Sequence, residues 1–381
     1  FTDQSSGSPA SWNWSFGDAT PNSTLQNPTH TYSGTGNYNV TLTVSNAYGT
    51  SSLRKTSYIT VTPPPPFLSG WSYRRLHTIA GSSSGDLTDY QIRCTVWNTT
   101  GTDSGENVYI GSLVNPDFSD LRFTTTANTL LPYWIQETGS NYAIVWVRIP
   151  SIPATGTQMY LYYGNPTASS LSNGDTTFPF FDDFSGSALN TVRWPSSRGT
   201  AVSSGTCVLD VSSDSSGSQD LIYATPYTVP INSTLEFRFK PEPASKARAG
   251  ISDAESLFCN NGMNYLGLQF FSDGYLYTDT NNGNSVTQTK EVPYSAAFQV
   301  IAIAWNPGSA RFLRDGTLIR EYTSNVPTGS DSLHILFRDV QTIDWVFVRN
   351  FSSSGPEHSS WNPEDSNFIS IEPSQGISRD V

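Results

Sequence analysis

Alternation of apolar and polar residues, repeated along the whole chain, is the feature that most constrains its fold. Residues 38–44, 142–149 and 343–349 read YNVTLTV, YAIVWVRI and IDWVFVR. Alternation of this kind indicates strands with one buried face and one solvated face. Turn-forming clusters such as SGTG, NNGN and RDG separate the runs, and we find almost no helical periodicity. The pattern predicts an all-β chain of antiparallel sandwiches, not alternating strand–helix units.

Breaks in the alternation predict the domain boundaries. A chain of 381 residues is long enough for two to four domains. A four-proline run cannot pair in a sheet and favours a stiff linker. Two further stretches of turn-forming or polar residues contain no apolar run, so each marks another boundary. The predicted organisation is three tandem sandwiches with linkers and a final strand segment: 1–62, linker 63–66, 67–176, 177–352, linker 353–366 and 367–381.

Composition limits the class of function. The net charge of −12 argues against nucleic acid and anionic membrane surfaces as partners, because both need clustered Lys and Arg. No run of 18 apolar residues occurs, so we expect no membrane insertion in this segment. Six N-x-[ST] sequons fit a glycosylated protein of the extracellular space or cell surface; they lie at Asn13, Asn22, Asn39, Asn98, Asn232 and Asn350.

Three cysteines are present, and none forms a CxxC pair. A zinc or redox site is therefore not expected. Cys207 and Cys259 fall in the same predicted domain and could form one disulfide, which would leave Cys94 unpaired and buried. Cysteine usage does not decide the compartment.

Residues 1–62 carry a specific resemblance. WNWSFGD at 12–18, NPTHTY at 27–32 and GNYNVTLTVSNAYG at 36–49 resemble a PKD domain. That family is an immunoglobulin-like β-sandwich common on archaeal and bacterial surfaces. The residues themselves agree with this, since alternation directs Trp14 and Phe16 inward on one strand and Val40, Leu42 and Val44 inward on another.

The two ends of the chain are complementary. A PKD domain begins with a further strand, but this sequence opens with FTDQSSGSP, which resembles the second strand. Residues 368–381 read FISIEPSQGISRDV, which is how such a domain usually opens. We expect this segment to join the first domain of the next unit, as one period of a tandem repeat or by β-strand addition between copies. Its apolar contacts would come from Phe368, Ile369, Ile371 and Ile377.

The other two domains also resemble known families. The order of WSYRRLHTIA, DLTDYQIRCTV, SDLRFTT, LLPYWIQE, YAIVWVRIPSIP and MYLYYGNP within 67–176 resembles a β-sandwich domain of unknown function from archaeal and bacterial surface proteins. Within it, Tyr133 and Trp134 could form an aromatic platform, although core packing or an inter-domain seam is favoured. FPFFDDFSGSALNTVRW and IDWVFVRNF, the two ends of 177–352, resemble those of a concanavalin-like, laminin-G-like jelly roll.

The jelly-roll resemblance suggests two binding sites. Its first and last strands lie near one another, so Asp182, Asp183 and Asp344 could approach and hold calcium through carboxylate oxygens, or could instead cap turns. A concave face could stack sugars on Tyr265, Tyr275 and Tyr277, or these rings could belong to the core.

Catalytic patterns are not found in the sequence. A glycoside hydrolase needs two carboxylates across the sugar, which on one strand usually gives an E-x-D-x-E pattern, and none occurs. No G-x-S-x-G or H-E-x-x-H is present. We therefore expect a non-enzymatic structural or adhesive surface protein that self-associates head to tail into a filament, sheath or array. The alternative is an adhesin that binds cell-surface or extracellular glycans through the jelly roll.

Overall fold

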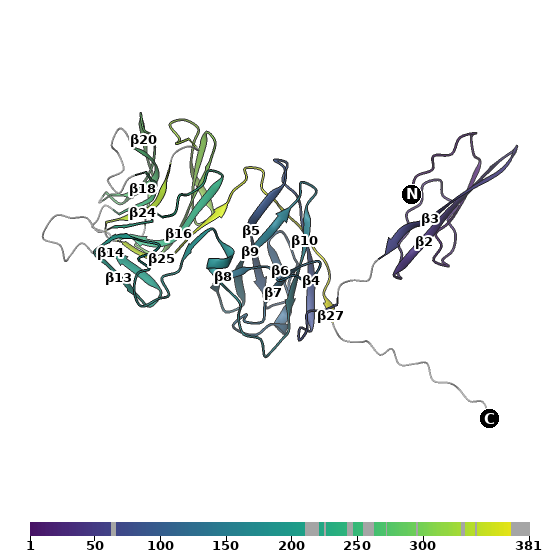
Figure 1. The fold of residues 1–381 in the computed structure, drawn as a ribbon, viewed down its shortest axis with the longest axis horizontal. Coiled ribbons are helices and arrows are strands. Elements are labelled where there is room, and N and C mark those ends of the chain that lie inside the picture. Colours follow the sequence, from purple (N-terminus) through teal and green to yellow (C-terminus); the bar gives the residue numbers. More distant parts are fainter. Residues whose placement is uncertain are drawn as a thin grey trace, which may run out of the picture. The chain divides into compact units, whose positions relative to one another are not determined.

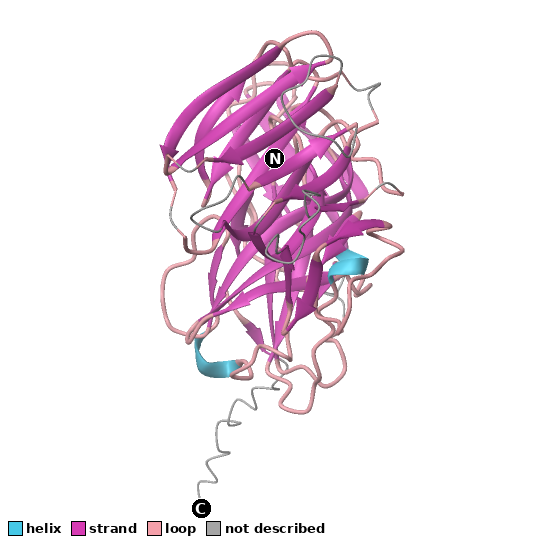
Figure 2. Cartoon of the chain, turned by 90° about the vertical axis from the view of Figure 1, so that its left-hand side faces the viewer, coloured by secondary structure: helices cyan, strands magenta, loops and turns pink. Residues whose placement is uncertain are grey.

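The computed structural model describes residues 1–61, 66–209, 221–224, 226–241, 247–253, 263–271, 273–294, 296–328, 332–339 and 341–366. Strands dominate this part of the chain, and its helices are two short turns, η1 (Gly111–Leu113) and α1 (Gly174–Thr177) (Figure 2). The prediction of an all-β fold is therefore confirmed. No helix among the described residues is long and apolar enough to cross a membrane.

The chain divides into two compact units, Phe1–Pro66 and Phe67–Val381. The first unit is built on one antiparallel sheet in the order β1 (Ser11–Ser15), β2 (Gly36–Asn46) and β3 (Gly49–Val61). Alternation gives this sheet one apolar face, because Trp14 pairs with Leu42 and Leu42 pairs with Leu53. The neighbouring row, Asn13, Thr43 and Ser52, is polar and lies on the opposite face.

The second unit begins with a sandwich of two sheets, here called the middle sandwich (Figure 1). Its core contains Ile92, Cys94, Val96 and Leu161, all fully or almost fully buried, so Cys94 is buried as expected. One sheet has the order β6 (Asn107–Tyr109), β5 (Leu87–Trp97), β9 (Tyr142–Ile152) and β8 (Tyr133–Thr138). The other contains β26 (His358–Trp361), β4 (Tyr73–Ile79), β10 (Thr157–Tyr163) and β7 (Arg122–Thr125), with β27 (Asp365–Ser366) also on β4.

The prediction that 353–366 is a linker is wrong, because β26 and β27 pair with β4. Trp361 stacks on His77 with ring centroids 3.8 Å apart, and His77 Nε2 lies 2.8 Å from His358 Nδ1. Burial, reinforced by the charge of His358, lowers the pKa of His77 to about 3, so the pair is neutral at pH 7. Arg74 adds an ion pair of 2.8 Å to Asp365. These contacts fix the chain to the middle sandwich up to residue 366.

The remaining strands form a larger two-layered sandwich, the jelly roll. Its aromatic core includes Trp194, Phe237, Trp305 and Phe337. One sheet has the order β13 (Thr200–Ser203), β14 (Thr206–Leu209), β25 (Gln341–Asn350), β16 (Ser233–Pro241), β21 (Gln299–Asn306), β22 (Ser309–Arg314) and β23 (Thr317–Tyr322), with β11 (Phe180–Asp182) on β25. The other has β12 (Ser196–Arg198), β15 (Leu221–Tyr223), β24 (His334–Arg338), β17 (Arg248–Ser252), β18 (Asn264–Phe270), β19 (Tyr275–Asn282) and β20 (Val286–Pro293).

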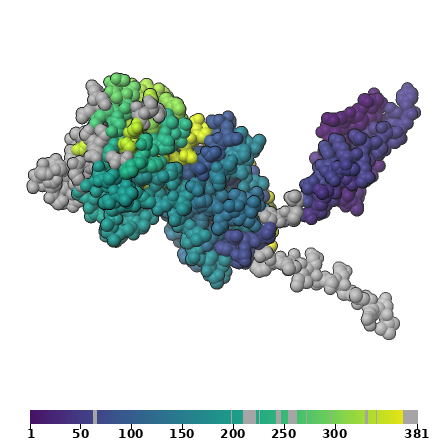
Figure 3. All heavy atoms as spheres, viewed as in Figure 1, coloured from purple at the N-terminus to yellow at the C-terminus, as the bar shows by residue number. Residues whose placement is uncertain are grey.

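The middle sandwich and the jelly roll share a second, smaller core, here called the aromatic seam, and form one continuous body (Figure 3). Trp134 therefore lies at an inter-domain seam, as the sequence favoured. Gln91 strengthens this junction, because its side-chain oxygen accepts a hydrogen bond of 2.9 Å from the backbone of Asn350. The seam consists of Trp134, Trp146, Phe178, Phe181, Trp345 and Phe347.

Candidate functional site

A groove on residues 1–61, lined by both apolar and polar side chains, is the clearest candidate site. It has a volume of about 480 Å³ and lies on the apolar face of the β1–β2–β3 sheet. Residues 1–6 line one side, where the Phe1 ring packs 5.6 Å from Trp14 and 5.3 Å from Phe16. The floor and the other side are Trp14, Val40, Leu42, Val44, Leu53, Lys55 and Tyr58. We call this the acceptor groove.

The acceptor groove leaves large apolar side chains in water. Leu53 is 64% exposed and Tyr58 is 49% exposed, although both belong to a sheet face whose other members form a core. β3 is the last strand of its sheet, so within the described residues its outer edge pairs with nothing. β3 is a 13-residue edge strand, and its segment Gly49–Lys55 pairs regularly with β2 before a bulge near Ser57. An unpaired strand edge beside a groove can accept an additional strand.

The residues predicted to fill this groove cannot be placed. Phe368, Ile369, Ile371 and Ile377 lie outside the described residues, as does Cys259. The four-proline linker is outside them as well, except for Pro66. The inter-subunit strand therefore stays a prediction. The predicted disulfide is not formed, because Cys207 is a free cysteine. Cys207 itself is buried in the jelly-roll core.

The predicted calcium site is not formed, and the described residues hold no group of three metal-ligating side chains. Asp182 turns inward, where its Oδ2 accepts a hydrogen bond of 2.8 Å from Trp194 Nε1. Asp344 ion-pairs with Arg238 on the outer face of the same sheet. Asp183 caps a turn by accepting from the backbone N–H of Ser185 at 3.1 Å. The sequence predicted correctly that β11 and β25 are adjacent. The side chains of Asp182 and Asp344, however, point to opposite faces of their sheet.

The three predicted sugar-stacking tyrosines do not form a platform. Tyr265 is 0% exposed and packs with Tyr223 and Leu336, so it cannot meet a sugar. Tyr275 is half-buried, but the ammonium of Lys290 lies 3.7 Å from its ring centroid and covers one ring face. Tyr277 donates a hydrogen bond of 2.8 Å to Asp273. Tyr275 and Tyr277 are thus already engaged by Lys290 and Asp273, which are neighbours on the same surface.

The sequons differ in how accessible their amides are. Asn13, Asn22 and Asn232 are exposed, whereas Asn39, Asn98 and Asn350 are half-buried. The side-chain nitrogen of Asn350 donates hydrogen bonds of 3.0 Å to the carbonyls of both Thr88 and Asp89. A glycan on Asn350 would replace these bonds, which hold the jelly roll to β5.

A buried carboxylate on the outer face of the β18–β19 pair has no sequence signal. Burial raises the pKa of Asp279 to about 7, against the opposing effect of the charge of Arg248. Because this folded-state pKa lies above the ordinary aspartate value of 3.8, the folded chain keeps a proton that the unfolded chain releases. Stability from this group is present below about pH 4 and is lost as the pH rises through 7.

Asp279→Asn is therefore expected to raise the free energy of unfolding at pH 8 and to change it little at pH 4. The gain has an upper bound of about 4 kcal/mol, from roughly 1.4 kcal/mol per pKa unit. Urea unfolding at the two pH values measures it. Asp273→Asn is the control, because Lys290 lowers the pKa of that exposed carboxyl. A gain of the same size at pH 4 would show that burial of charge is not the cause.

Comparisons with known proteins agree with the first two predicted modules. Residues 1–61 match the PKD domain family. Residues 117–197 match the domain of unknown function DUF2341, so this match continues past the predicted boundary at 176 into β11 and β12. Among curated proteins, none matches the chain.

The solved structures that match cover the jelly-roll part. One comes from work on "endo-acting O-glycanases" of the human gut microbiota that "initiate mucin breakdown"; it is 12% identical, with 46% of this chain and 100% of that chain covered and a TM-score of 0.39. The endo-β-1,3-glucanase from Pyrococcus furiosus is 14% identical, with 46% and 95% covered and a TM-score of 0.36. The Bacillus licheniformis β-glucanase is 13% identical, with 45% and 97% covered and a TM-score of 0.36.

These neighbours correct one prediction. The expectation that the chain is not an enzyme is contradicted, because solved structures similar to it include glucanases and an O-glycanase. The fold is compatible with an enzyme. Sequence identities of 12–14% show similarity of fold alone. Neither a substrate nor a catalytic residue can therefore be assigned to this chain from these structures.

Proposed function

We propose that the protein is a subunit of an extracellular surface assembly whose copies join head to tail. In this proposal, residues 367–381 of one copy enter the acceptor groove of the next as an added β-strand. The PKD domain and the jelly roll indicate an extracellular surface protein. The observation that carries the finer proposal is the acceptor groove, an apolar sheet face that leaves Leu53 and Tyr58 in water.

Sequence and groove match in chemistry. Ile369 and Ile371 alternate, so in an extended strand both side chains would face the same side. That side would meet Leu53 on β3, the nearest member of the apolar face that continues to Leu42 and Trp14. Main-chain hydrogen bonds to an unpaired edge would supply affinity and the apolar side chains would supply register.

A strand passed from copy to copy makes a heterologous contact. Such a contact uses two different surfaces of each molecule, and unless the rotation closes into a ring, it continues indefinitely. The anchoring of β26 and β27 on β4 suits this role, because pull on residue 367 would be borne by the middle sandwich. A tandem repeat would fill the same groove with a covalently linked strand.

Removing residues 367–381 is expected to abolish assembly. Sedimentation velocity of the intact chain should show species larger than a monomer that grow with concentration, whereas the chain ending at 366 should sediment as a monomer at every concentration. Circular dichroism of both provides the control for folding. Equal sedimentation of the two folded chains would contradict strand donation.

A further inference from the structure

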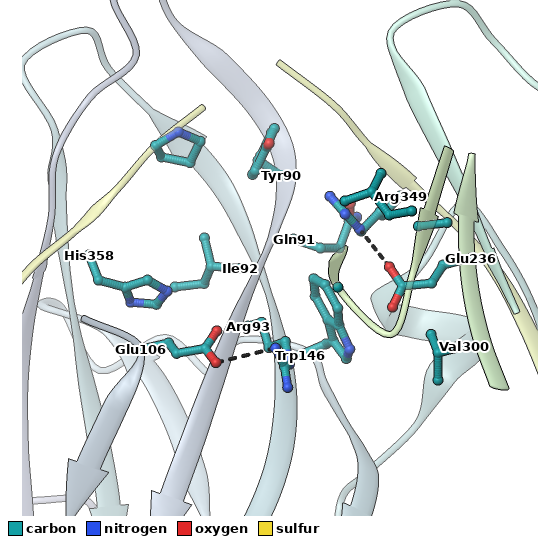
Figure 4. Close-up of a pocket in the computed structure, with 14 residues that line it drawn as sticks. Tyr90, Gln91, Ile92, Arg93, Glu106, Trp146, Glu236, Val300, Arg349 and His358 are labelled. Carbon is teal, nitrogen blue, oxygen red and sulfur yellow. Dashed lines mark hydrogen bonds and ion pairs between the residues drawn. The ribbon is translucent and has the colours of Figure 1, made fainter. Parts of the chain in front are cut away.

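A cavity between the middle sandwich and the jelly roll has no role in the proposed assembly. Its volume is about 300 Å³, at the lower end of the range of ligand pockets, about 300–1,000 Å³. β5 and β9 form one wall, and β16, β21 and β25 form the other. Figure 4 shows that the polar side chains of both walls converge on the space between them.

Each wall contributes one ion pair. Arg93 Nη1 lies 3.2 Å from Glu106 Oε1 on the middle sandwich. Arg349 Nε lies 3.3 Å from Glu236 Oε2 on the jelly roll. The second pair lies deeper, since the side chain of Glu236 is 11% exposed and that of Glu106 is 34% exposed. The lining therefore carries two positive and two negative charges that balance.

The ion pairs leave hydrogen-bonding capacity toward the cavity. An ionised carboxylate can accept about four hydrogen bonds and a guanidinium has five N–H donors, while the closest contact of each ion pair joins a single oxygen to a single nitrogen. Donors and acceptors are thus presented side by side from both walls. Neighbouring hydroxyl groups, each of which donates and accepts, are the ligand groups that match such a lining.

Aromatic and apolar side chains complete the cavity. Trp146 and Tyr90 are buried among the lining residues, and the guanidinium of Arg349 lies 5.1 Å from the ring centroid of Trp146. Trp146 Nε1 is already bonded to Gln136 at 2.7 Å and the side chain is 5% exposed, so Trp146 closes one side of the cavity and offers neither a donor nor a ring face for stacking. A sugar would therefore be held through its hydroxyl groups, which match the donors and acceptors of the two ion pairs.

The balanced charge of the lining disfavours small ligands that carry a net charge. A phosphate or carboxylate would meet Glu106 and Glu236, and an ammonium would meet Arg93 and Arg349, in a space partly shielded from water where like charges repel strongly. We propose that this inter-sandwich cavity binds one neutral sugar unit through the Arg93–Glu106 and Arg349–Glu236 pairs. The site is separate from the acceptor groove and from the tyrosines of β18 and β19.

Saturation-transfer NMR on the intact chain tests this with glucose, galactose, mannose and N-acetylglucosamine as neutral probes and inorganic phosphate as the charged one. At least one sugar is expected to bind with a millimolar Kd, and phosphate is expected not to bind. Glu106→Gln should raise the Kd by about 10-fold or more, since a hydrogen bond to a charged group contributes about 1.5–3 kcal/mol. Comparing the free sugar with an oligosaccharide ending in it distinguishes a free ligand from a glycan terminus.

Glu321→Gln is the matched control, because Glu321 forms an exposed ion pair with Arg311 and neither residue lines the cavity. The sugar affinity of this variant should be unchanged. Glu106 is the preferred test position because it lies near the mouth, where loss of charge does not strand a deeply buried Arg. No binding of any neutral sugar, binding unaffected by Glu106→Gln, or preferential phosphate binding would each overturn the proposal.

Discussion

Leu53→Asp is expected to prevent head-to-tail assembly, whereas Ser52→Asp is expected to leave it intact. The two residues are neighbours on β3, but Leu53 faces the acceptor groove and Ser52 faces the polar side, where its hydroxyl lies 2.9 Å from that of Thr43. An aspartate at 53 would have to be buried against the apolar side chains of the incoming strand, which is costly even with Lys55 on the same side of β3. Both positions are exposed in the single chain, so neither change should unfold it.

The expected loss for Leu53→Asp is about 100-fold or more in the affinity between copies, equivalent to about 3 kcal/mol. Sedimentation velocity across a concentration series of the two variants and the parent chain measures this. Equal assembly of the two variants would mean that the groove does not take part in the contact, whatever the fate of residues 367–381.

Phe347→Ala is expected to cost about 3–5 kcal/mol and to uncouple the middle sandwich from the jelly roll. Phe347 is 0% exposed, stacks on Phe178 at 4.1 Å and lies 5.2 Å from Trp345 and 5.5 Å from Trp146. Its ring thus contacts both sides of the aromatic seam. Removing it leaves a cavity at the junction that the rigid sheets on either side cannot close.

Differential scanning calorimetry should show the parent residues 67–381 unfolding in one transition and the Phe347→Ala chain unfolding in two at lower temperature. Leu318→Ala on β23 is the control, because that side chain is 43% exposed and should change the unfolding temperature little. A single, unshifted transition in the Phe347→Ala chain would mean that the seam does not couple the two sandwiches.

The alternation of the sequence predicted individual strands well. The run at 142–149 is part of β9 and the run at 343–349 is part of β25. Alternation works because each strand buries one face and its partners lie on the same sheet. It also identified the apolar row of Trp14 and Leu42 that forms the floor of the acceptor groove.

Features that depend on distant partners could not be predicted from local pattern. β26 reads HSSW, which is short and polar, and becomes a strand only because β4, almost 300 residues earlier, offers an edge and His77 a surface for Trp361. The calcium prediction failed for a related reason. It used the proximity of β11 and β25, but which face Asp182 and Asp344 occupy is decided by the packing of Trp194 and Arg238.

No feature of the sequence indicated the inter-sandwich cavity. Glu106 and Glu236 are 130 residues apart in sequence and belong to different sandwiches, so no motif spacing joins them. The aromatic seam brings these walls together, and it was predicted only in part, through Trp134.

The central claim is that residues 367–381 of one copy occupy the acceptor groove of another. Electron cryo-microscopy of assemblies formed by the intact chain tests it most directly. We predict density for an added strand in the groove, with Ile369 and Ile371 against Leu53 of β3, continuous with residue 366 of a neighbouring copy. A chain that forms no assemblies, assemblies whose groove is empty, or a groove filled by the tail of the same copy would contradict the account.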